Sequence, residues 1–343
     1  DKVTVRFEGT DGRETGTVFG IRVASTAGET VIAPVRLLET PDKAIRDIAV
    51  APDGSIFTFD YVDYKVKKFD KTGRFLLEFG GTGTGAGQFT HLTGIRAFRD
   101  KLLAVDSVGL LTFGLDGRFL NKTAFPEEIT PNYSLALEDG RYVGFQIVAA
   151  ELKAVLTLRS PQGRELDRLA AHDLKEFFPE LKAGEEFYLS DEYARDYLYA
   201  LNPGGDVLWA ASDAVRVQVY SGGKSRVIVA ENLTPVPLPE DERAKLARRK
   251  ANAKPPFFAY VPDRYPLLRH LAVGPDGDIW VFVQSQEKTG FLRYAKDGMP
   301  KGFATVQADF DVARSVVRVL GGRMFFISGK TLYAADLPGT GTR

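Results

Sequence analysis

The chain has 343 residues, of which 44% are hydrophobic and 11% aromatic, so it can bury a large core within one all-β domain. Its 45 basic and 45 acidic residues cancel, so it lacks the basic excess that non-specific nucleic-acid binding requires. The absence of cysteine excludes disulfides, thiolate metal sites and a cysteine nucleophile. No apolar run approaches the roughly 18 residues of a membrane-spanning helix, so no membrane span is expected.

A segment near the start of the chain recurs near its end. Ile48-Ala-Val-Ala-Pro-Asp-Gly54 is matched by Leu271-Ala-Val-Gly-Pro-Asp-Gly277, and each copy resembles an apolar strand followed by a tight turn. A second strand follows each copy, and then a further turn that ends in glycine. This repeated unit predicts the blades of a β-propeller, so residues 1–343 are expected to form a single all-β domain.

Six such units predict six blades, at residues 45–79, 94–124, 133–169, 197–230, 268–306 and 315–337. The last unit has only three clear strands, whereas residues 1–40 contain candidate strands at 3–7, 18–24 and 30–38. Since a propeller ring must close, we expect one of these N-terminal strands to complete the last blade. The alternative is that residues 1–40 form a seventh, degenerate blade.

Two segments interrupt the repeats. Residues 171–196 include a short helical turn at 172–179, and residues 231–266 form a Pro-rich insertion between blades four and five. Three acidic residues at 240–242 and three basic residues at 248–250 predict a helix between them, because this order complements the helix dipole. We interpret the insertion as a solvated helix over one face of the propeller, with a lid or partner-docking element as the alternative.

The stretch from Val66-Lys-Lys-Phe-Asp70 through Phe79-Gly80 to Gly85-Ala-Gly-Gln-Phe89 resembles the NHL-repeat family and the TolB-like exported propellers. The resemblance covers residues 45–95 and weakens elsewhere. It implies a six-bladed fold, a periplasmic or extracellular location and no fixed activity. The chain begins at Asp1 rather than Met, and removal of a secretory signal is the reason that we expect.

Aligning the six inner strands on Ile48 identifies side chains expected at the mouth of the central channel. The residues two positions earlier are Arg46, Thr93, Tyr133, Tyr197, Arg269 and Arg314, with Asp47, His91 and His270 close by. Arginines beside tyrosines suit an anionic or planar group, because guanidinium groups match carboxylates and phosphates. The alternative is that each arginine pairs with a local acid, such as Asp47 or Asp311, and ties blades together.

Metal-dependent chemistry is not predicted at this mouth. Some NHL-type propellers are lyases whose metal is held by several histidines, but the chain has only three, and His172 is expected in a loop outside the blades. Asp47 is the one carboxylate of the ring, which is too few for calcium. We therefore expect neither a metal nor another cofactor.

The sequence predicts a non-enzymatic binding or assembly module whose partner is a protein or a small anionic ligand. One alternative is a hydrolase or lyase that uses the channel, with His91, His270 and Asp47 as its acid–base groups. That alternative requires both histidines to face one pocket. The other alternative is a structural subunit of a larger oligomeric or extracellular assembly. The oligomeric state does not follow from the sequence.

Overall fold

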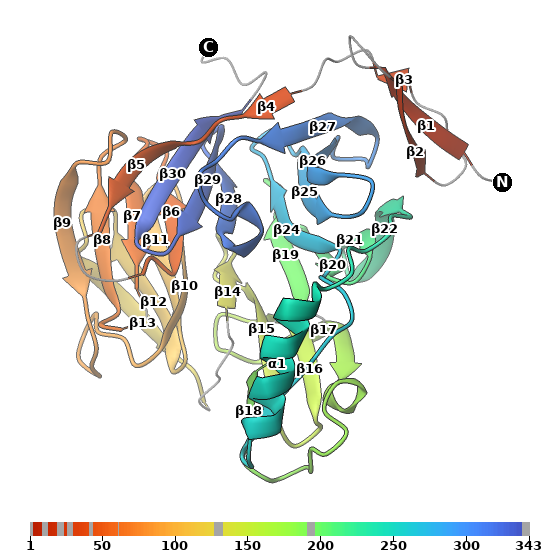
Figure 1. The fold of residues 1–343 in the computed structure, drawn as a ribbon. Helices are drawn as coiled ribbons and strands as arrows, with labels where there is room; N and C mark the ends of the chain where they lie inside the picture. Colours follow the sequence, from red (N-terminus) through yellow and green to blue (C-terminus); the bar gives the residue numbers. More distant parts are fainter. Residues whose placement is uncertain are drawn as a thin grey trace.

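The computed structural model describes residues 30–40, 44–60, 62–126, 133–190 and 196–337, together with the backbone of three earlier strands, β1 (Val3–Glu8), β2 (Arg13–Val18) and β3 (Ala24–Ser25). Six antiparallel sheets follow one another along the chain and form the blades (Figure 1). The first strand of each blade lies innermost. The inner strand of the last blade packs against that of the first, which closes the ring.

Blades one to three each contain four consecutive strands. Blade one is β6 (Asp47–Val50), β7 (Ile56–Phe59), β8 (Lys65–Phe69) and β9 (Phe75–Gly80). Blade two is β10 (Leu92–Ala97), β11 (Lys101–Asp106), β12 (Gly109–Gly114) and β13 (Phe119–Ala124). Blade three is β14 (Tyr133–Ala136), β15 (Tyr142–Val148), β16 (Lys153–Arg159) and β17 (Glu165–Asp173).

Blades four to six continue the ring. Blade four is β19 (Tyr197–Leu201), β20 (Val207–Ala211), β21 (Val215–Ser221) and β22 (Lys224–Glu231). Blade five is β24 (Leu268–Val273), β25 (Ile279–Gln284), β26 (Thr289–Tyr294) and β27 (Pro300–Val306). Blade six begins with β28 (Val316–Leu320), β29 (Arg323–Ser328) and β30 (Thr331–Asp336).

An N-terminal strand completes blade six, which confirms the predicted closure. Strand β5 (Val35–Glu39) pairs antiparallel with β30, and Leu38 lies opposite Leu332. Both leucines are buried in a cluster that joins blades six and one, so this strand is sealed into the core. Strand β4 (Thr30–Ile32) adds in parallel to the outer edge of blade five, and β2 touches blade four. The described N-terminal strands therefore extend existing blades, and the seventh-blade alternative is wrong for them.

The core lies between the faces of neighbouring blades. Phe57 and Phe59 of blade one pack with Phe113 of blade two in one buried cluster, while Ile56 packs with Phe325 of blade six in another. Each blade thus buries apolar side chains on both faces, because a twisted sheet in a ring has a neighbour on either side. The channel at the centre of the ring is lined by side chains of the inner strands.

The repeated Pro-Asp-Gly unit forms the same turn in both places. The Asp53 carboxylate accepts a hydrogen bond from the Ser55 backbone N–H at 2.8 Å, and Asp276 accepts one from that of Asp278 at 3.1 Å. The glycine between has a positive φ in each copy, 84° at Gly54 and 86° at Gly277, a conformation that other residues rarely adopt. The repeat therefore encodes the inner hairpin of a blade.

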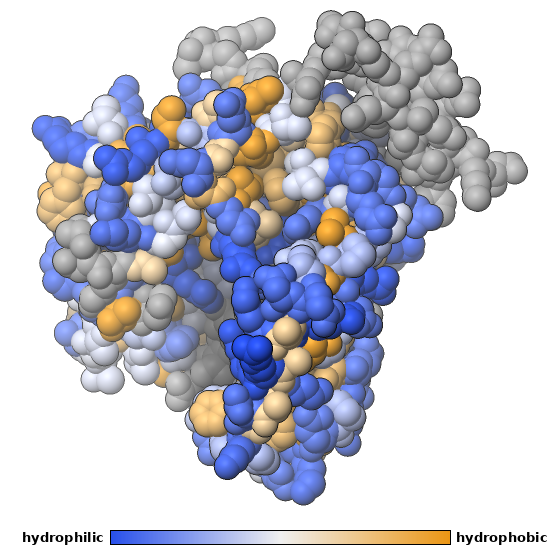
Figure 2. Space-filling view, viewed as in Figure 1, coloured by the Kyte–Doolittle hydropathy of each residue, from blue (hydrophilic) through white to orange (hydrophobic). Residues whose placement is uncertain are grey.

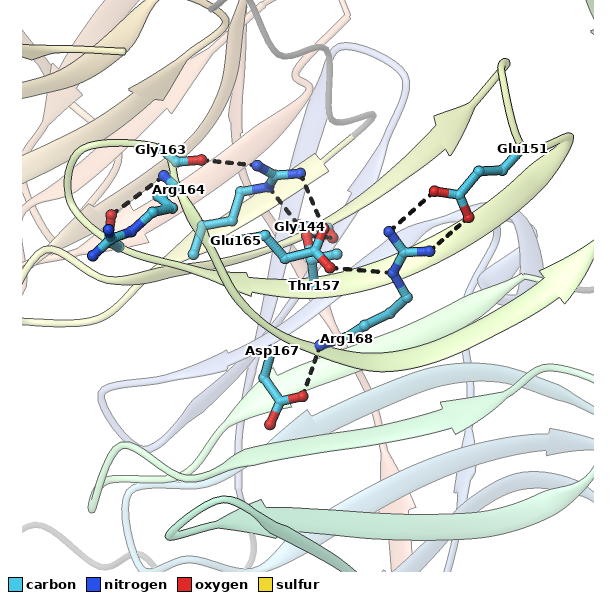
Figure 3. Close-up of polar contacts among 10 residues, drawn as sticks. Gly144, Glu151, Thr157, Gly163, Arg164, Glu165, Asp167 and Arg168 are labelled. Carbon is cyan, nitrogen blue, oxygen red and sulfur yellow. Dashed lines mark hydrogen bonds and ion pairs between the residues drawn. The ribbon is translucent and has the colours of Figure 1, made fainter. Parts of the chain in front are cut away.

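Arginines tie the strands of blade three together (Figure 3). Arg168 on β17 contacts Glu151 in the turn before β16 at 2.8 Å and its strand neighbour Glu165 at 3.2 Å. The buried Arg159 donates to the Gly163 carbonyl at 2.8 Å, which braces the outer turn. Strand β17 also extends to Asp173, so His172 lies in a blade strand opposite Ala154 and not in a loop as predicted. The cause is that β16 is long enough to pair with these added residues.

The two interruptions of the repeat pack against each other. A 3-10 turn, η1 (Leu174–Glu176), follows blade three, and strand β18 (Tyr188–Ser190) pairs in parallel with β23 (Phe257–Ala259) of the insertion. The insertion also contains the predicted helix, α1 (Glu240–Asn252), whose one fully buried residue is Leu246. The surface over α1 is largely hydrophilic (Figure 2).

Blade six is preceded by a second 3-10 turn, η2 (Val312–Arg314), which brings the chain from the outer edge of blade five to the channel. Asp311 caps this turn by accepting a hydrogen bond from the Ala313 backbone N–H at 3.0 Å. No helix in the described part of the chain has both the length and the apolar character needed to cross a membrane.

Candidate functional site

Two cavities occupy the central channel, one toward each end. The upper cavity, of about 560 Å³, is lined by the first residues of inner strands such as Leu268 of β24 and Val316 of β28. The lower cavity, of about 250 Å³, is lined by the last residues of the same strands, such as Val273 and Leu320. Side chains near the middle of the channel line both cavities and separate them, namely those of Tyr133, Tyr199, Leu271, Val317 and Arg318.

The upper cavity brings together six of the nine residues predicted at the mouth: Arg46, Tyr133, Tyr197, Arg269, His270 and Arg314. Arg318 on β28 adds a fourth arginine to its lining, whereas Asp196 is the one carboxylate there among the described residues. The wall of the cavity is therefore cationic. Guanidinium groups held this way favour an anion, because the low-dielectric surroundings strengthen their attraction to it.

The other three predicted residues lie outside this cavity. Asp47 is completely buried behind it. Thr93 is also buried, and its hydroxyl donates to the Val105 carbonyl at 3.0 Å. His91 is exposed, its ring lies 2.9 Å from the Tyr64 hydroxyl, and its backbone N–H donates to Asp106. The register shift in β10 between Leu92 and Gly94 does not by itself explain this placement, because β24 has one between Leu268 and His270 and its residues line the cavity.

The predicted arginines are anchored by different partners. Arg269 donates through two guanidinium nitrogens to the Ala313 carbonyl, at 3.0 and 3.1 Å. Arg314 pairs with Glu242 of α1 at 3.1 Å and with Asp311 at 3.5 Å. The pairing with Asp311 is the one named in the alternative interpretation, while Glu242 links the insertion to the channel mouth. These contacts fix the guanidinium groups at the rim and so preorganise it.

Arg318 is the cation that the sequence alignment missed. Its Nε donates to the buried Asp47 carboxylate at 2.9 Å, and its guanidinium carbon lies 4.6 Å from the centre of the Tyr133 ring. Burial disfavours the charge of Arg318, but Asp47 and Tyr133 together outweigh burial and raise the pKa of the guanidinium. The signal in the sequence was an arginine within an otherwise apolar inner strand, where only the channel can hold a charged side chain.

His270 is held as a hydrogen-bond donor. Its Nε2–H donates to the Val312 carbonyl at 2.7 Å, and burial lowers the pKa of the imidazole to about 3. The ring is therefore neutral near pH 7 and is a weak proton acceptor. His91 does not line the cavity that His270 lines, so the two histidines do not meet the requirement of the hydrolase or lyase alternative.

The described residues contain no group of three or more histidine, aspartate or glutamate side chains placed to hold a metal ion. Acids beside the upper cavity pair with its arginines, as Asp47 does with Arg318 and Glu242 with Arg314. The arrangement that the structure does offer is a set of guanidinium groups around a hollow.

Comparisons with known proteins agree with this architecture. A family model described as a 6-bladed beta-propeller matches residues 36–174, and no curated protein matches the chain. Among solved structures, a protein of Bacteroides fragilis described as a candidate exported protein is similar with a TM-score of 0.50 and 11% identity, covering 90% of this chain and 100% of that chain.

Two enzymes are also among the similar structures. A streptogramin B lyase has a TM-score of 0.47 and 12% identity, covering 97% of this chain and 93% of its own. A gluconolactonase from Xanthomonas campestris has a TM-score of 0.46 and 14% identity, covering 91% and 98%. Such low identities carry no activity across, since one propeller fold serves many functions. The six sheets and the matching family model show that the chain is a six-bladed β-propeller.

Proposed function

We propose that this protein is a non-enzymatic binding module that takes a small anionic ligand in the upper cavity. The observation that carries the proposal is the convergence of Arg46, Arg269, Arg314 and Arg318 on one hollow of about 560 Å³. That volume lies within the range of about 300–1,000 Å³ that is usual for small-molecule sites. The tyrosines of the same wall supply aromatic surface, so a carboxylate or phosphate on a planar body fits best.

The rim contacts suggest how the ligand enters. The Arg314 side chain is about half exposed, at 52%, and meets the Glu242 carboxylate of α1 across the mouth. A ligand carboxylate offers Arg314 the same group that Glu242 offers it, so binding exchanges one partner for another, and the displaced Glu242 keeps Lys245 at 3.8 Å. Arg318 at the floor then faces the deeper end of the ligand.

A triple substitution tests this proposal. Replacing Arg46, Arg269 and Arg314 by glutamine removes three cations while keeping side chains of similar length. We expect the affinity for carboxylates and phosphates to fall by about 100-fold or more, because each charge-assisted hydrogen bond contributes roughly 1.5–3 kcal/mol. Isothermal titration calorimetry with citrate, benzene dicarboxylates and inorganic phosphate, repeated at raised salt, measures the change.

The matched control is Arg226→Gln on the outer strand of blade four. Its side chain is exposed and lines neither cavity of the channel. Equal anion affinities for the triple variant and the control, with both proteins folded, would refute the proposal. Turnover of an ester or lactone by the wild-type protein would instead support the enzymatic alternative.

A location outside the cytoplasm is part of the same proposal. The location is supported by the resemblance of residues 45–95 to exported propellers and by the description of the Bacteroides fragilis protein as exported. Fractionation of source cells tests it, and recovery with the cytoplasmic proteins would contradict it. The mass in solution separates a monomeric binder from a subunit of a larger assembly.

A further inference from the structure

The lower cavity differs from the upper one in its chemistry. Apart from two tyrosines and two arginines, its lining consists of apolar side chains, glycines and prolines, and no carboxylate is among the described residues that line it. Six apolar members come from the six blades, one from each: Ile48, Ile95, Leu135, Leu201, Leu271 and Val319. The body of an apolar ligand would therefore meet hydrocarbon on every side of the ring.

One of the two arginines is Arg96, the residue before the last in β10. Its guanidinium carbon lies 5.7 Å from the centre of the Phe98 ring. Throughout the described part of the chain, its side chain makes no hydrogen bond and no ion pair. The residue is partly buried, and burial lowers the pKa of its guanidinium, with Tyr133 and Asp47 opposing the effect.

Arg318 provides the contrast that makes Arg96 informative. Both arginines line the lower cavity, but Arg318 has the Asp47 carboxylate at 2.9 Å and Arg96 has no carboxylate partner. A partly buried cation without a counter-ion is unfavourable, and proteins normally pair such groups or use them. Arg96 lines the lower cavity, so a carboxylate that enters this cavity can reach its guanidinium.

We propose that the lower cavity is a second binding site, which takes a small apolar or aromatic monocarboxylate whose carboxylate pairs with Arg96. The planar fork of the guanidinium can hold both carboxylate oxygens, and the apolar body of the ligand then fills the ring of aliphatic side chains. The cavity of about 250 Å³ lies just below the range of drug-sized sites. It therefore suits an acid with on the order of ten non-hydrogen atoms, such as octanoate or a phenyl-substituted acetate.

This site does not depend on the ligand of the upper cavity. The two hollows share only the residues at the middle of the channel, and the Arg46, Arg269 and Arg314 side chains line the upper one alone. An anion held at the upper rim meets several cations and few apolar groups, whereas a ligand in the lower cavity meets one unpaired cation and many apolar groups. Hydrophobic monocarboxylates should thus bind in the lower cavity, and small polar anions in the upper one.

Titration of the full chain with octanoate, phenylacetate and the neutral octanamide tests the proposal. We expect the acids to bind, octanamide to bind at least about tenfold more weakly, and Arg96→Met to lose about tenfold or more of the octanoate affinity. Methyl NMR locates the ligand, because Ile48 and Ile95 line the lower cavity whereas Leu198 and Leu268 line the upper one. The shifts are expected at the two isoleucines.

Arg226→Met on the outer strand β22 is the matched control, because it removes an exposed arginine and should leave octanoate binding unchanged. Arg96→Met replaces an unpaired cation by an apolar side chain in apolar surroundings, so the variant should fold and melt no earlier than the wild type. Three results overturn the proposal: no binding of either acid, equal octanoate affinity in Arg96→Met and wild type, or methyl shifts confined to Leu198 and Leu268. The last result, with binding lost in the triple upper variant, would place the acid at the upper site.

Discussion

Three channel residues show how differently single side chains are held in one apolar channel. Arg318 is neutralised by Asp47, Arg96 lacks a carboxylate partner in the described chain, and His270 loses its charge altogether. In each case burial disfavours the charged form, and the outcome depends on whether an opposite charge lies nearby. The Asp47 side chain has one oxygen on Arg318 and a second oxygen without a hydrogen-bond partner among the described residues. The middle of the channel therefore depends on that single ion pair.

His270 predicts how stability depends on pH. Burial lowers the pKa of the folded imidazole to about 3 from its ordinary 6.5, so between these values the unfolded chain binds a proton that the folded chain does not. The free energy of unfolding should thus rise with pH across this window, and acidification from neutral pH to about pH 4 should remove about 3 kcal/mol through this residue.

His270→Gln keeps a donor for the Val312 carbonyl and removes the titration. Urea unfolding of wild type and variant at both pH values measures the difference between their pH dependences. The explanation fails if the two proteins lose the same stability on acidification, or if an NMR titration places the pKa of His270 near 6.5.

Among the elements, the inner strands approach one another most closely where side chains are absent. A Cβ added to Gly94 of β10 would overlap the backbone carbonyl oxygen of Ser134 at the start of β14. The hydroxyl of Thr93, the residue before it, donates a hydrogen bond to the Ser134 hydroxyl at 3.2 Å, so blades two and three are in contact at both residues. Gly94 is thus required for close packing of two backbones, and not for an unusual φ.

Gly94→Ala should destabilise the fold strongly. Since the group in the way is backbone, relief requires movement of one inner strand against the next, and we expect a loss of about 3 kcal/mol or more in the free energy of unfolding. Gly204→Ala is the matched control, because an added Cβ there meets only the Asn202 side chain in an exposed turn. Thermal and urea unfolding measure both variants, and similar values for the two would contradict the packing argument.

For the whole molecule, ring closure is the feature on which the rest depends. Strand β5 supplies the outer strand of blade six, so the last blade contains residues from both ends of the described chain. Without β5, β30 would present an open edge, and the buried Leu332 and Phe325 would lose part of their cover. The channel cavities need the closed ring too, because their lining comes from blades all around it.

Deleting residues 1–40 should open blade six and lower the melting temperature by about 10 °C or more, because a whole buried strand is removed. A synthetic peptide of residues 30–44 added to the truncated protein should bind at the edge of β30 and restore part of that loss, as in strand addition between chains. A peptide with Leu38→Asp is the control, because it carries the same backbone with a charge at the buried position. Full stability of the truncated protein, or equal rescue by both peptides, would contradict this account.

The architecture could be predicted from the sequence because short, repeated residue patterns specify the turns and strands of each blade. The Pro-Asp-Gly turns recur with their glycines at positive φ, and the acidic start and basic end of α1 agree with the helix Glu240–Asn252. These signals act over a few residues, so no tertiary information is needed to interpret them.

The candidate site was predicted less completely. One rule of spacing was applied to six inner strands, but the Thr93 hydroxyl is buried against Val105 and Ser134, and neither Thr93 nor His91 lines the upper cavity. Arg96 and Arg318 lie inside strands and not before them, so the same rule passed over both. Whether a guanidinium has a carboxylate beside it is decided by residues far apart in the sequence, as for Arg318 and Asp47, and local patterns do not contain that information.

The pairing of Thr331 with Glu39 also constrains the order in which the protein folds. Almost the entire described chain lies between these two partners, so the closing contact carries the largest loop-closure entropy of any blade. Blades one to five can form from neighbouring segments, whereas blade six has to wait for the C-terminal strands. A chain emerging from a ribosome or a translocon would therefore hold β5 unpaired until β30 has been synthesised. The pairing of β5 with β30 closes the ring late in folding, and we expect this pairing to set the folding rate.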